Sequence, residues 1–537
     1  MKQGSSEFVV GTNQSATLYA FEKESKKLSL RTIHHLKYLK MKKFISFSPV
    51  VLFFCLPVFA ISQQTSQPSM VTEINGMSNY FPMKISDAEY LYAFKKSGDA
   101  LATEFFKFDT SLQVLWRKNL PVGTIDYAKS GDKLVIFSSS QWTGDWSQIK
   151  TLHVTSVEIK DGITVQDKDL LTTDDKLFMV PLVLKDSLND FKGVLLRYAT
   201  SKQKDELPTA VSQRIEWILL DDNLDVKTHV TLNNDFTNSI FLTSYTTAKG
   251  DLITYNIAQN KLTADKYSEG KPDKVGSLSA TLSQSTDLMV RSYSLSVSPD
   301  EKNSLCTVSF TPDEKLFNVV VTKFDFLQNK ADAFVTDQKD KHDFSKKNYG
   351  VPYTILPLDV EFYKNGFVKV EQLVTRSHLV HMMSSSIEYN LGDVIVSFFD
   401  EKMRETGHLT ITDARPSFFR DRYPQHNVNI RTHPGIKIIG NKMVISAGAR
   451  DNVLDENPFN KKKFVLERNL RYVVADLDSA NIIKDTTIAL DTKLHPVGYY
   501  FSGLDAWMNN TALLYHIWRD PLIKNVSIIL EKIPFNF

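Results

Sequence analysis

Arginines, histidines and aromatic residues are concentrated in one short stretch of the chain, "ARPSFFRDRYPQHNVNIRTHPG". A guanidinium group binds carboxylate, sulfate or phosphate through two parallel hydrogen bonds, and aromatic rings stack on sugars or peptides. The combination indicates a site for an anionic ligand, with histidines that add charge in mild acid. The candidate ligand-binding residues of this loop are Arg415, Arg420, Arg422, Tyr423, His426, Arg431 and His433.

A plainer alternative exists for the same stretch. Its arginines could pair with Asp413 and Asp421 in a solvated loop, which is the commoner role of an exposed run of charges. The segment that follows, 449–463, is rich in Asp, Asn and Lys, but it lacks the D-x-D-x-D-G order of a calcium loop.

A second candidate lies in "SSSQWTGDWSQIK", where Trp142 and Trp146 stand four residues apart between two expected strands. Tryptophans in exposed loops are often contact residues for a partner. The alternative is that both rings fill a gap inside the fold, which is their commoner use.

Motifs of familiar enzymes are missing from the sequence. Neither a G-x-S-x-G elbow nor an H-E-x-x-H zinc motif occurs. His378 and His381 have the spacing of a metal pair only on a helix, and their neighbours predict strands, on which the two rings point to opposite faces. We therefore expect no metal site and no cofactor.

The segment "MKKFISFSPVVLFFCLPVFAIS" has the layout of a secretory signal peptide. Two lysines precede an apolar run, which ends in small residues before Gln63. The run is interrupted by prolines and is short for a membrane span, and Phe54 is too large for a lipoprotein signal acylated at Cys55. We expect residues 41–62 to be the signal peptide, and residues 1–40 to precede the natural start at Met41.

Charge and cysteine content narrow the functional class. Residues 1–62 hold nine Lys/Arg and three Asp/Glu, so the remainder carries a net charge of −4, against +2 for the whole chain. A mildly acidic protein lacks the basic footprint of a nucleic-acid binder. Beyond the signal only Cys306 remains, which rules out an intrachain disulfide, and no further apolar run is long enough to span a membrane.

Short segments of alternating apolar residues follow one another from about Val71 to the end, which predicts an all-β protein. Two of them align: "FFKFDTSLQVLWRKNL" and "WILLDDNLDVKTHVTL" each read as strand, Asp-opened turn and strand, with Asp109 matching Asp221. Weaker copies turn at Asp161, Asp325, Asp400 and Asp478, and a degenerate copy lies near Ile257.

The spacing of these turns indicates the architecture. Asp109 and Asp161 are 52 residues apart, Asp161 and Asp221 are 60 apart, and Asp221 and Asp325 are separated by two such units. A unit of this length with about four strands is a propeller blade. We predict one β-propeller domain over residues 63–537, with about seven blades, six or eight being possible.

The segment "SYSLSVSPDEKNSLCTVSF" resembles the strand–turn–strand unit of TolB-type and WD-type propeller blades. Ser298–Lys302 stands where those families have S-P-D-G-K, with Glu301 in place of the glycine. The resemblance implies a propeller of a secreted bacterial type, and it implies no particular function.

These observations favour an exported, non-catalytic binding or scaffolding propeller, located in the periplasm or outside the cell. We expect a protein or glycan partner, no nucleic acid, and no stable membrane insertion after signal cleavage. The alternative is an enzyme that acts on an anionic glycan or similar polymer at the Arg/His-rich loop 415–433.

Overall fold

The structure is a computed structural model that describes residues 70–534 with gaps. The described residues are 70–74, 83–86, 88–95, 103–120, 123–140, 149–173, 177–186, 190–200, 214–233, 239–258, 260–282, 289–311, 318–336, 351–381, 384–411, 419–421, 435–449, 469–489, 499–508, 511–519 and 526–534. The proposed signal peptide and upstream segment lie outside them.

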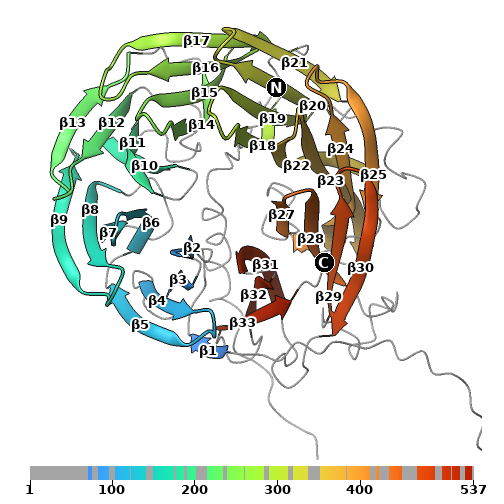
Figure 1. Cartoon of the computed structure of the whole chain (residues 1–537), viewed down its shortest axis with the longest axis horizontal. Helices are drawn as coiled ribbons and strands as arrows, with labels where there is room; N and C mark the ends of the chain where they lie inside the picture. The colour runs from blue at the N-terminus through green and yellow to red at the C-terminus, as the bar shows by residue number, and fades with distance from the viewer. Residues whose placement is uncertain are drawn as a thin grey trace, which may run out of the picture.

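The described residues contain thirty-three strands, which form seven four-stranded antiparallel sheets and one five-stranded sheet arranged around a ring (Figure 1). Blades 1 to 4 are β2–β5 (Met83–Lys84, Glu89–Lys95, Thr103–Asp109, Val114–Leu120), β6–β9 (Gly123–Ser130, Lys133–Ser139, Thr151–Glu158, Thr164–Thr172), β10–β13 (Leu177–Lys185, Phe191–Thr200, Ile215–Leu220, Val226–Thr231) and β14–β17 (Ile240–Thr246, Leu252–Ala258, Lys261–Tyr267, Lys274–Thr281). Blades 5 to 7 are β18–β21 (Met289–Val297, Asn303–Thr311, Asn318–Asp325, Lys330–Thr336), β22–β26 (Val351–Tyr363, Gly366–His381, Ser384–Phe399, Glu405–Ile411, Phe419–Asp421) and β27–β30 (Gly435–Ile439, Lys442–Ala449, Asn469–Asp476, Asn481–Ala489).

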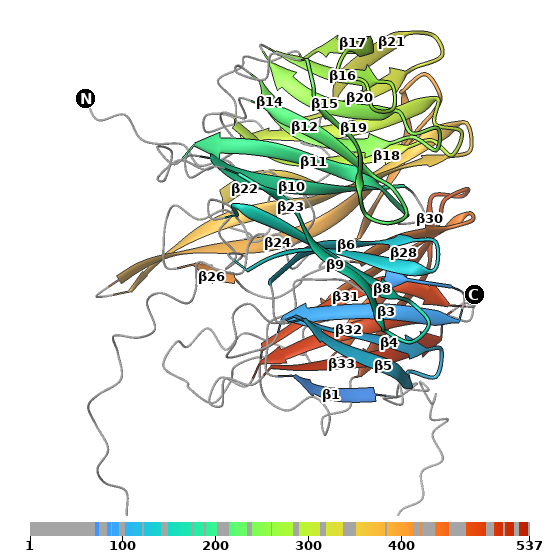
Figure 2. The same cartoon turned by 90° about the vertical axis from the view of Figure 1, so that its left-hand side faces the viewer.

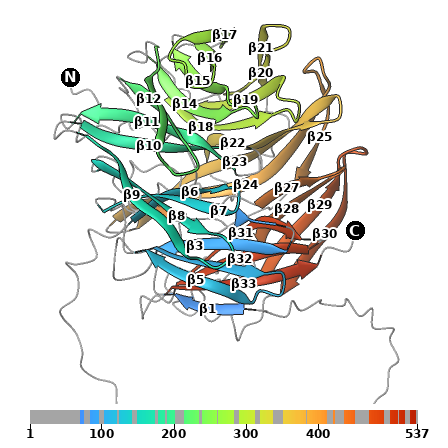
Figure 3. The same ribbon diagram turned by 60° about the vertical axis from the view of Figure 1, so that its left-hand side comes forward.

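Blade 8 joins the two ends of the described chain. Its strands are β31 (Tyr499–Met508), β32 (Thr511–Arg519), β33 (Val526–Pro534) and, outermost, β1 (Met70–Ile74), which pairs antiparallel with β33 (Figure 3). The all-β propeller is confirmed, and the number of blades is eight, the upper value that the spacing left open. Within the described ranges, no helix is long and apolar enough to cross a membrane.

The core lies between neighbouring blades. One cluster joins blades 3 and 4 through Trp217, Leu195 and Phe241, and another joins blades 5 and 6 through Leu305, Phe367 and Phe399. Strands covered on both faces read as continuous apolar runs, which explains segments such as "IEWILL". Cys306 is buried on β19, which raises the pKa of its thiol to about 12.

The Asp-opened turns are equivalent, as the repeat predicted. Asp109 Oδ1 accepts hydrogen bonds from the backbone N–H groups of Ser111 and Gln113, and Asp221 Oδ1 does the same for Asn223 and Asp225. Both turns join the third and fourth strands, in blades 1 and 3. In both, the leucine three residues after the aspartate has a positive φ, 63° at Leu112 and 56° at Leu224.

Three assignments of the repeat were wrong. In blade 2, β8 ends at Glu158 and Asp161 lies inside the turn, where its Oδ1 accepts a hydrogen bond from the N–H of Ile163. In blade 7 the turn is opened by Asp476, whose Oδ1 accepts from the N–H groups of Asp478 and Ser479, so Asp478 lies inside the turn. The degenerate copy near Ile257 is the hairpin between β15 and β16, the second and third strands of blade 4. Its alternation imitates the repeat, but the turn joins the other pair of strands.

The turn that resembles TolB-type and WD-type blades joins β18 to β19. Glu301 adopts the left-handed conformation there, with φ of 57°, so it takes the backbone geometry that a glycine adopts most easily. Its Oε1 accepts a hydrogen bond from the backbone N–H of Ala248 in blade 4, at 2.8 Å. This contact between blades offers a physical reason for a side chain at that position.

Candidate functional site

The propeller has two unlike faces. Because neighbouring strands are antiparallel, the connections between first and second strands and between third and fourth strands lie on one face, which we call the turn face. The other strand ends lie on the opposite face, the loop face. Figure 2 shows the hairpin of β23 and β24 projecting on the side opposite to the tight turns.

In the sequence, the predicted site residues all follow strands that end on the loop face. Trp142 and Trp146 lie between β7 and β8, the second and third strands of blade 2. The Arg/His loop lies between β25 of blade 6 and β27 of blade 7. Arg420 falls in β26 and is described; the other candidates, Arg415, Arg422, Tyr423, His426, Arg431, His433, Trp142 and Trp146, lie outside the described residues.

The hairpin of β23 and β24 is the most extended element of the loop face. Each strand has 16 residues, whereas β25, the outer strand beside them, has seven. β22 pairs with β23 only as far as Arg376, and β25 pairs with β24 only from Val394 onward. The remainder, Ser377–His381 with Ser384–Glu388, therefore extends beyond the four-stranded part of the blade.

β26 adds a third strand to this projecting end. Its three residues pair with β24 in the register Ile387 with Asp421, Glu388 with Arg420 and Tyr389 with Phe419. On the other side of β24, Ile387, Glu388 and Tyr389 pair with His378, Ser377 and Arg376 of β23, in that order. We call the segments 376–381, 384–389 and 419–421 the hairpin platform.

The platform brings together two features that are separate in the sequence. His378 and His381 lie on β23, a strand as predicted, and Arg420 lies two strands away at the same end of the hairpin. Arg420 is thus in a strand and not in a loop, which is a correction of the predicted setting. Cationic residue types outnumber acidic ones there: Arg376, His378, His381 and Arg420 against Glu388 and Asp421.

A second polar cluster lies in blade 3 and was not predicted. Glu216 is 6% exposed, and its Oε2 accepts hydrogen bonds from Tyr198 Oη at 2.5 Å and from His229 Nε2 at 2.7 Å. Arg214 Nε lies 2.9 Å from Glu216 Oε1. Burial and the hydrogen bond to Glu216 raise the pKa of Tyr198 well above its usual 10, so the phenol stays protonated.

A buried carboxylate beside a tyrosine and a histidine resembles an acid–base site. Here, however, both oxygens of Glu216 already interact with Tyr198, His229 and Arg214. This cluster fixes the ends of β11, β12 and β13 against each other at the loop face. The sequence signal was a glutamate and an arginine next to apolar residues in "RIEWILL", and the distant partners could not be read from it. Among the described residues, no group of three or more His, Cys, Asp or Glu side chains could hold a metal ion.

His153 of blade 2 lies between two carboxylates. Its Nδ1 is 2.9 Å from Asp169 Oδ1 and its Nε2 is 2.8 Å from Asp167 Oδ1, and only the protonated ring can donate to both. Burial lowers the pKa of His153, but the hydrogen bonds to Asp169 and Asp167 outweigh that effect and raise it above 6.5.

The raised pKa predicts a pH-dependent contribution to stability. It is fully present below the unfolded-state value of about 6.5 and is lost as pH rises through the folded-state pKa. Replacing His153 with Gln should therefore cost about 0.2–1 kcal/mol at pH ~6 and less at pH ~8.5. Urea unfolding at both pH values checks this; an equal cost at both would contradict it. Asp169→Asn should shift the imidazole titration, followed by NMR, toward the ordinary value.

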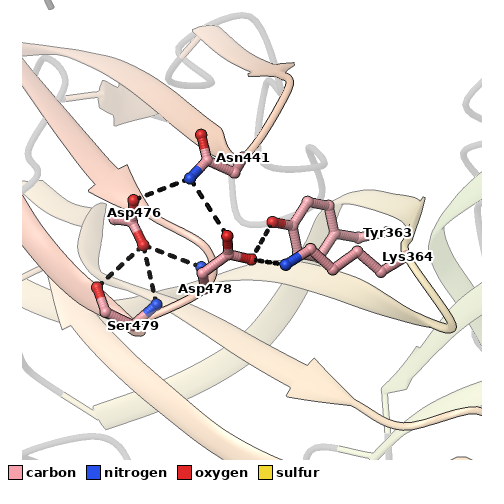
Figure 4. A network of polar contacts seen from close by, with 6 residues as sticks. All are labelled: Tyr363, Lys364, Asn441, Asp476, Asp478 and Ser479. Carbon is pink, nitrogen blue, oxygen red and sulfur yellow. Dashed lines mark hydrogen bonds and ion pairs between the residues drawn. The ribbon is translucent and has the colours of Figure 1, made fainter.

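The turn face carries a structural network between blades 6 and 7 (Figure 4). Asp478 accepts hydrogen bonds from Tyr363 Oη at 2.5 Å and from Lys364 Nζ. Tyr363 is the last residue of β22, and Lys364 follows it in the turn to β23. Asn441 Nδ2 donates to Asp476 and Asp478 at 3.2 and 3.3 Å. Three turns from two blades are tied together, which accounts for these charges without a ligand.

Comparisons with known proteins identify no family for this chain. No family model matches the chain, and no curated protein sequence matches it. Similar solved structures include the Dos1 propeller (9% identity, 87% of this chain and 95% of that one, TM-score 0.44) and the WD40 domain of SCAP from fission yeast (8% identity, 86% and 94%, TM-score 0.40). BamB from Moraxella catarrhalis is also similar (9% identity, 86% and 100%, TM-score 0.36). The described residues form an eight-bladed β-propeller.

Proposed function

We propose that the protein is an exported, non-catalytic binding propeller that holds an anionic partner, a glycan or a protein, at the hairpin platform. The observation that carries this proposal is the pairing of β26 with β24, which anchors the Arg/His loop to the strand pair that contains His378 and His381. Export is supported by the signal-like segment 41–62. A partner outside the cytoplasm would meet the platform without obstruction from the four-stranded part of blade 6.

Binding is favoured over catalysis by the composition of the platform. Hydrolysis of a glycan usually needs two carboxyl groups placed on either side of the scissile bond. The described platform holds two acidic residues, Glu388 and Asp421, which lie one register step apart on neighbouring strands. It also holds four residues that are arginine or histidine. Guanidinium groups on a sheet favour recognition of carboxylate, sulfate or phosphate groups.

Replacing both Arg420 and Arg422 with Ala tests the proposal. Each charge-assisted contact contributes about 1.5–3 kcal/mol, so affinity should fall about 10-fold or more for each arginine that contacts the ligand. Wild type should also bind more tightly at pH ~5.5 than at pH ~8, because histidines gain charge in acid. The measurement is calorimetric titration with sulfated and carboxylated glycans and acidic peptides, on protein recovered outside the cytoplasm with an N-terminus near Gln63.

The matched control is Arg117→Ala with Lys227→Ala, which removes the same charge from exposed side chains on the outer strands of blades 1 and 3. It should bind as wild type does. If neutral and anionic ligands bind equally, or if the Arg420/Arg422 variant binds unchanged, the platform is not the site, and Trp142 and Trp146 become the next residues to change.

A further inference from the structure

Three cationic side chains are buried in the described part of the chain, and two of them have carboxylate partners. Lys107 Nζ lies 2.8 Å from Glu89, and Lys369 Nζ lies 2.7 Å from Glu371. The third is Arg197, which is 9% exposed. Among the described residues it has no carboxylate within ion-pair distance, and its Nε has no hydrogen-bond acceptor.

Arg197 lies near the end of β11, toward the loop face, on the side of blade 3 that packs against blade 4. Its guanidinium carbon is 5.2 Å from the centre of the Phe241 ring on β14. Tyr293, on β18 of blade 5, interacts electrostatically with Arg197, and its hydroxyl is itself hydrogen-bonded to Thr243. Burial lowers the pKa of Arg197 to about 10, which leaves the group charged at neutral pH.

A buried charge without a partner is costly, and proteins normally pair it or hydrate it. The nearby Phe241 ring favours the cation, but it accepts none of the group's five N–H donors. The arrangement thus has the parts of an oxyanion site: a buried, positively charged donor, an aromatic neighbour and a neighbouring hydroxyl.

We infer that Arg197 binds an oxyanion, the carboxylate, phosphate or sulfate group of a ligand, between blades 3 and 4 at the loop face. The site is on different blades from the hairpin platform, which belongs to blade 6, so it does not depend on the proposed function. The sequence contains the signal in "VLLRYA", where one arginine interrupts an apolar strand. Only the side-chain contacts show that no acidic residue pairs with it in the described part of the chain.

Thermal unfolding in a series of anions tests the inference. Wild type, Arg197→Met and Arg197→Lys are compared in chloride, acetate, phosphate and sulfate at matched ionic strength. For wild type, one of the oxyanions should raise Tm saturably over chloride, by about 3 °C at a hundredfold excess over Kd. Arg197→Met should show no saturable rise, and in chloride it should be at least as stable as wild type, because it lacks the uncompensated charge.

The control is Arg117→Ala, an exposed arginine, which should keep the wild-type response. The inference is overturned if wild type responds to no oxyanion, which would mean that water alone satisfies Arg197, or if Arg197→Met keeps the response. If Arg197→Met fails to fold, the inference is tested by calorimetric titration of wild type and Arg197→Lys with the oxyanions. Lysine keeps the charge but lacks the planar guanidinium, so Arg197→Lys should bind the oxyanion at least 10-fold more weakly. Equal affinities would reject the site.

Discussion

Replacing Glu371 with Gln should lower the free energy of unfolding by about 3–5 kcal/mol, one of the largest effects of any single change in the described part of the chain. Glu371 and Lys369 are both fully buried on β23, with Lys369 Nζ 2.7 Å from Glu371 Oε1. Lys369 Nζ also donates to Thr336 Oγ1 of blade 5 at 2.8 Å and lies 5.8 Å from the centre of the Phe399 ring. Removing the carboxylate charge leaves an ammonium group in the interface between blades 5 and 6.

The matched control changes both partners, Lys369→Met with Glu371→Leu. Well-packed apolar residues can replace a buried ion pair at little cost, so the double variant should be considerably more stable than Glu371→Gln alone. Urea unfolding followed by circular dichroism gives the three free energies. If Glu371→Gln unfolds like wild type, or if the double variant is the least stable of the three, the ion pair does not have this role.

The sequence was sufficient for the fold class because the repeat is carried by local chemistry. Asp109 and Asp221 open turns by accepting hydrogen bonds from backbone groups two and four residues ahead, and that requirement is visible in the order of residues. It also gave the number of blades to within one of the eight that the described residues form. It misplaced the turn of blade 7, because Asp476 and Asp478 are both plausible turn openers and only hydrogen bonding separates them.

The site was less predictable, since its parts meet through pairings between distant segments. Neither "RSHLVH" nor "SFFRDRY" indicates that the two segments share β24 as a common neighbour. The same holds for Glu216, whose partners Tyr198 and His229 come from two other strands. Arg197 is the extreme case, because its importance lies in the lack of a carboxylate partner among the described residues.

Shortening the hairpin should abolish binding of the anionic partner and leave the propeller intact. The variant joins Arg376 to Tyr389 by a two-residue Asn-Gly turn, which suits a tight hairpin. All pairs between β22 and β23 remain, since β22 reaches only to Arg376, and all pairs between β24 and β25 remain. Two of the three register pairs that hold β26 are removed, together with His378 and His381.

The decisive measurement is the dissociation constant of this shortened variant for the anionic glycan or peptide that wild type binds best, with circular dichroism and urea unfolding as checks on the fold. A ligand that depends on the hairpin platform should bind the shortened variant at least 100-fold more weakly, the equivalent of about two charge-assisted contacts, while the β spectrum is unchanged. Wild-type affinity in a folded, shortened variant would contradict the assignment of the platform as the binding site.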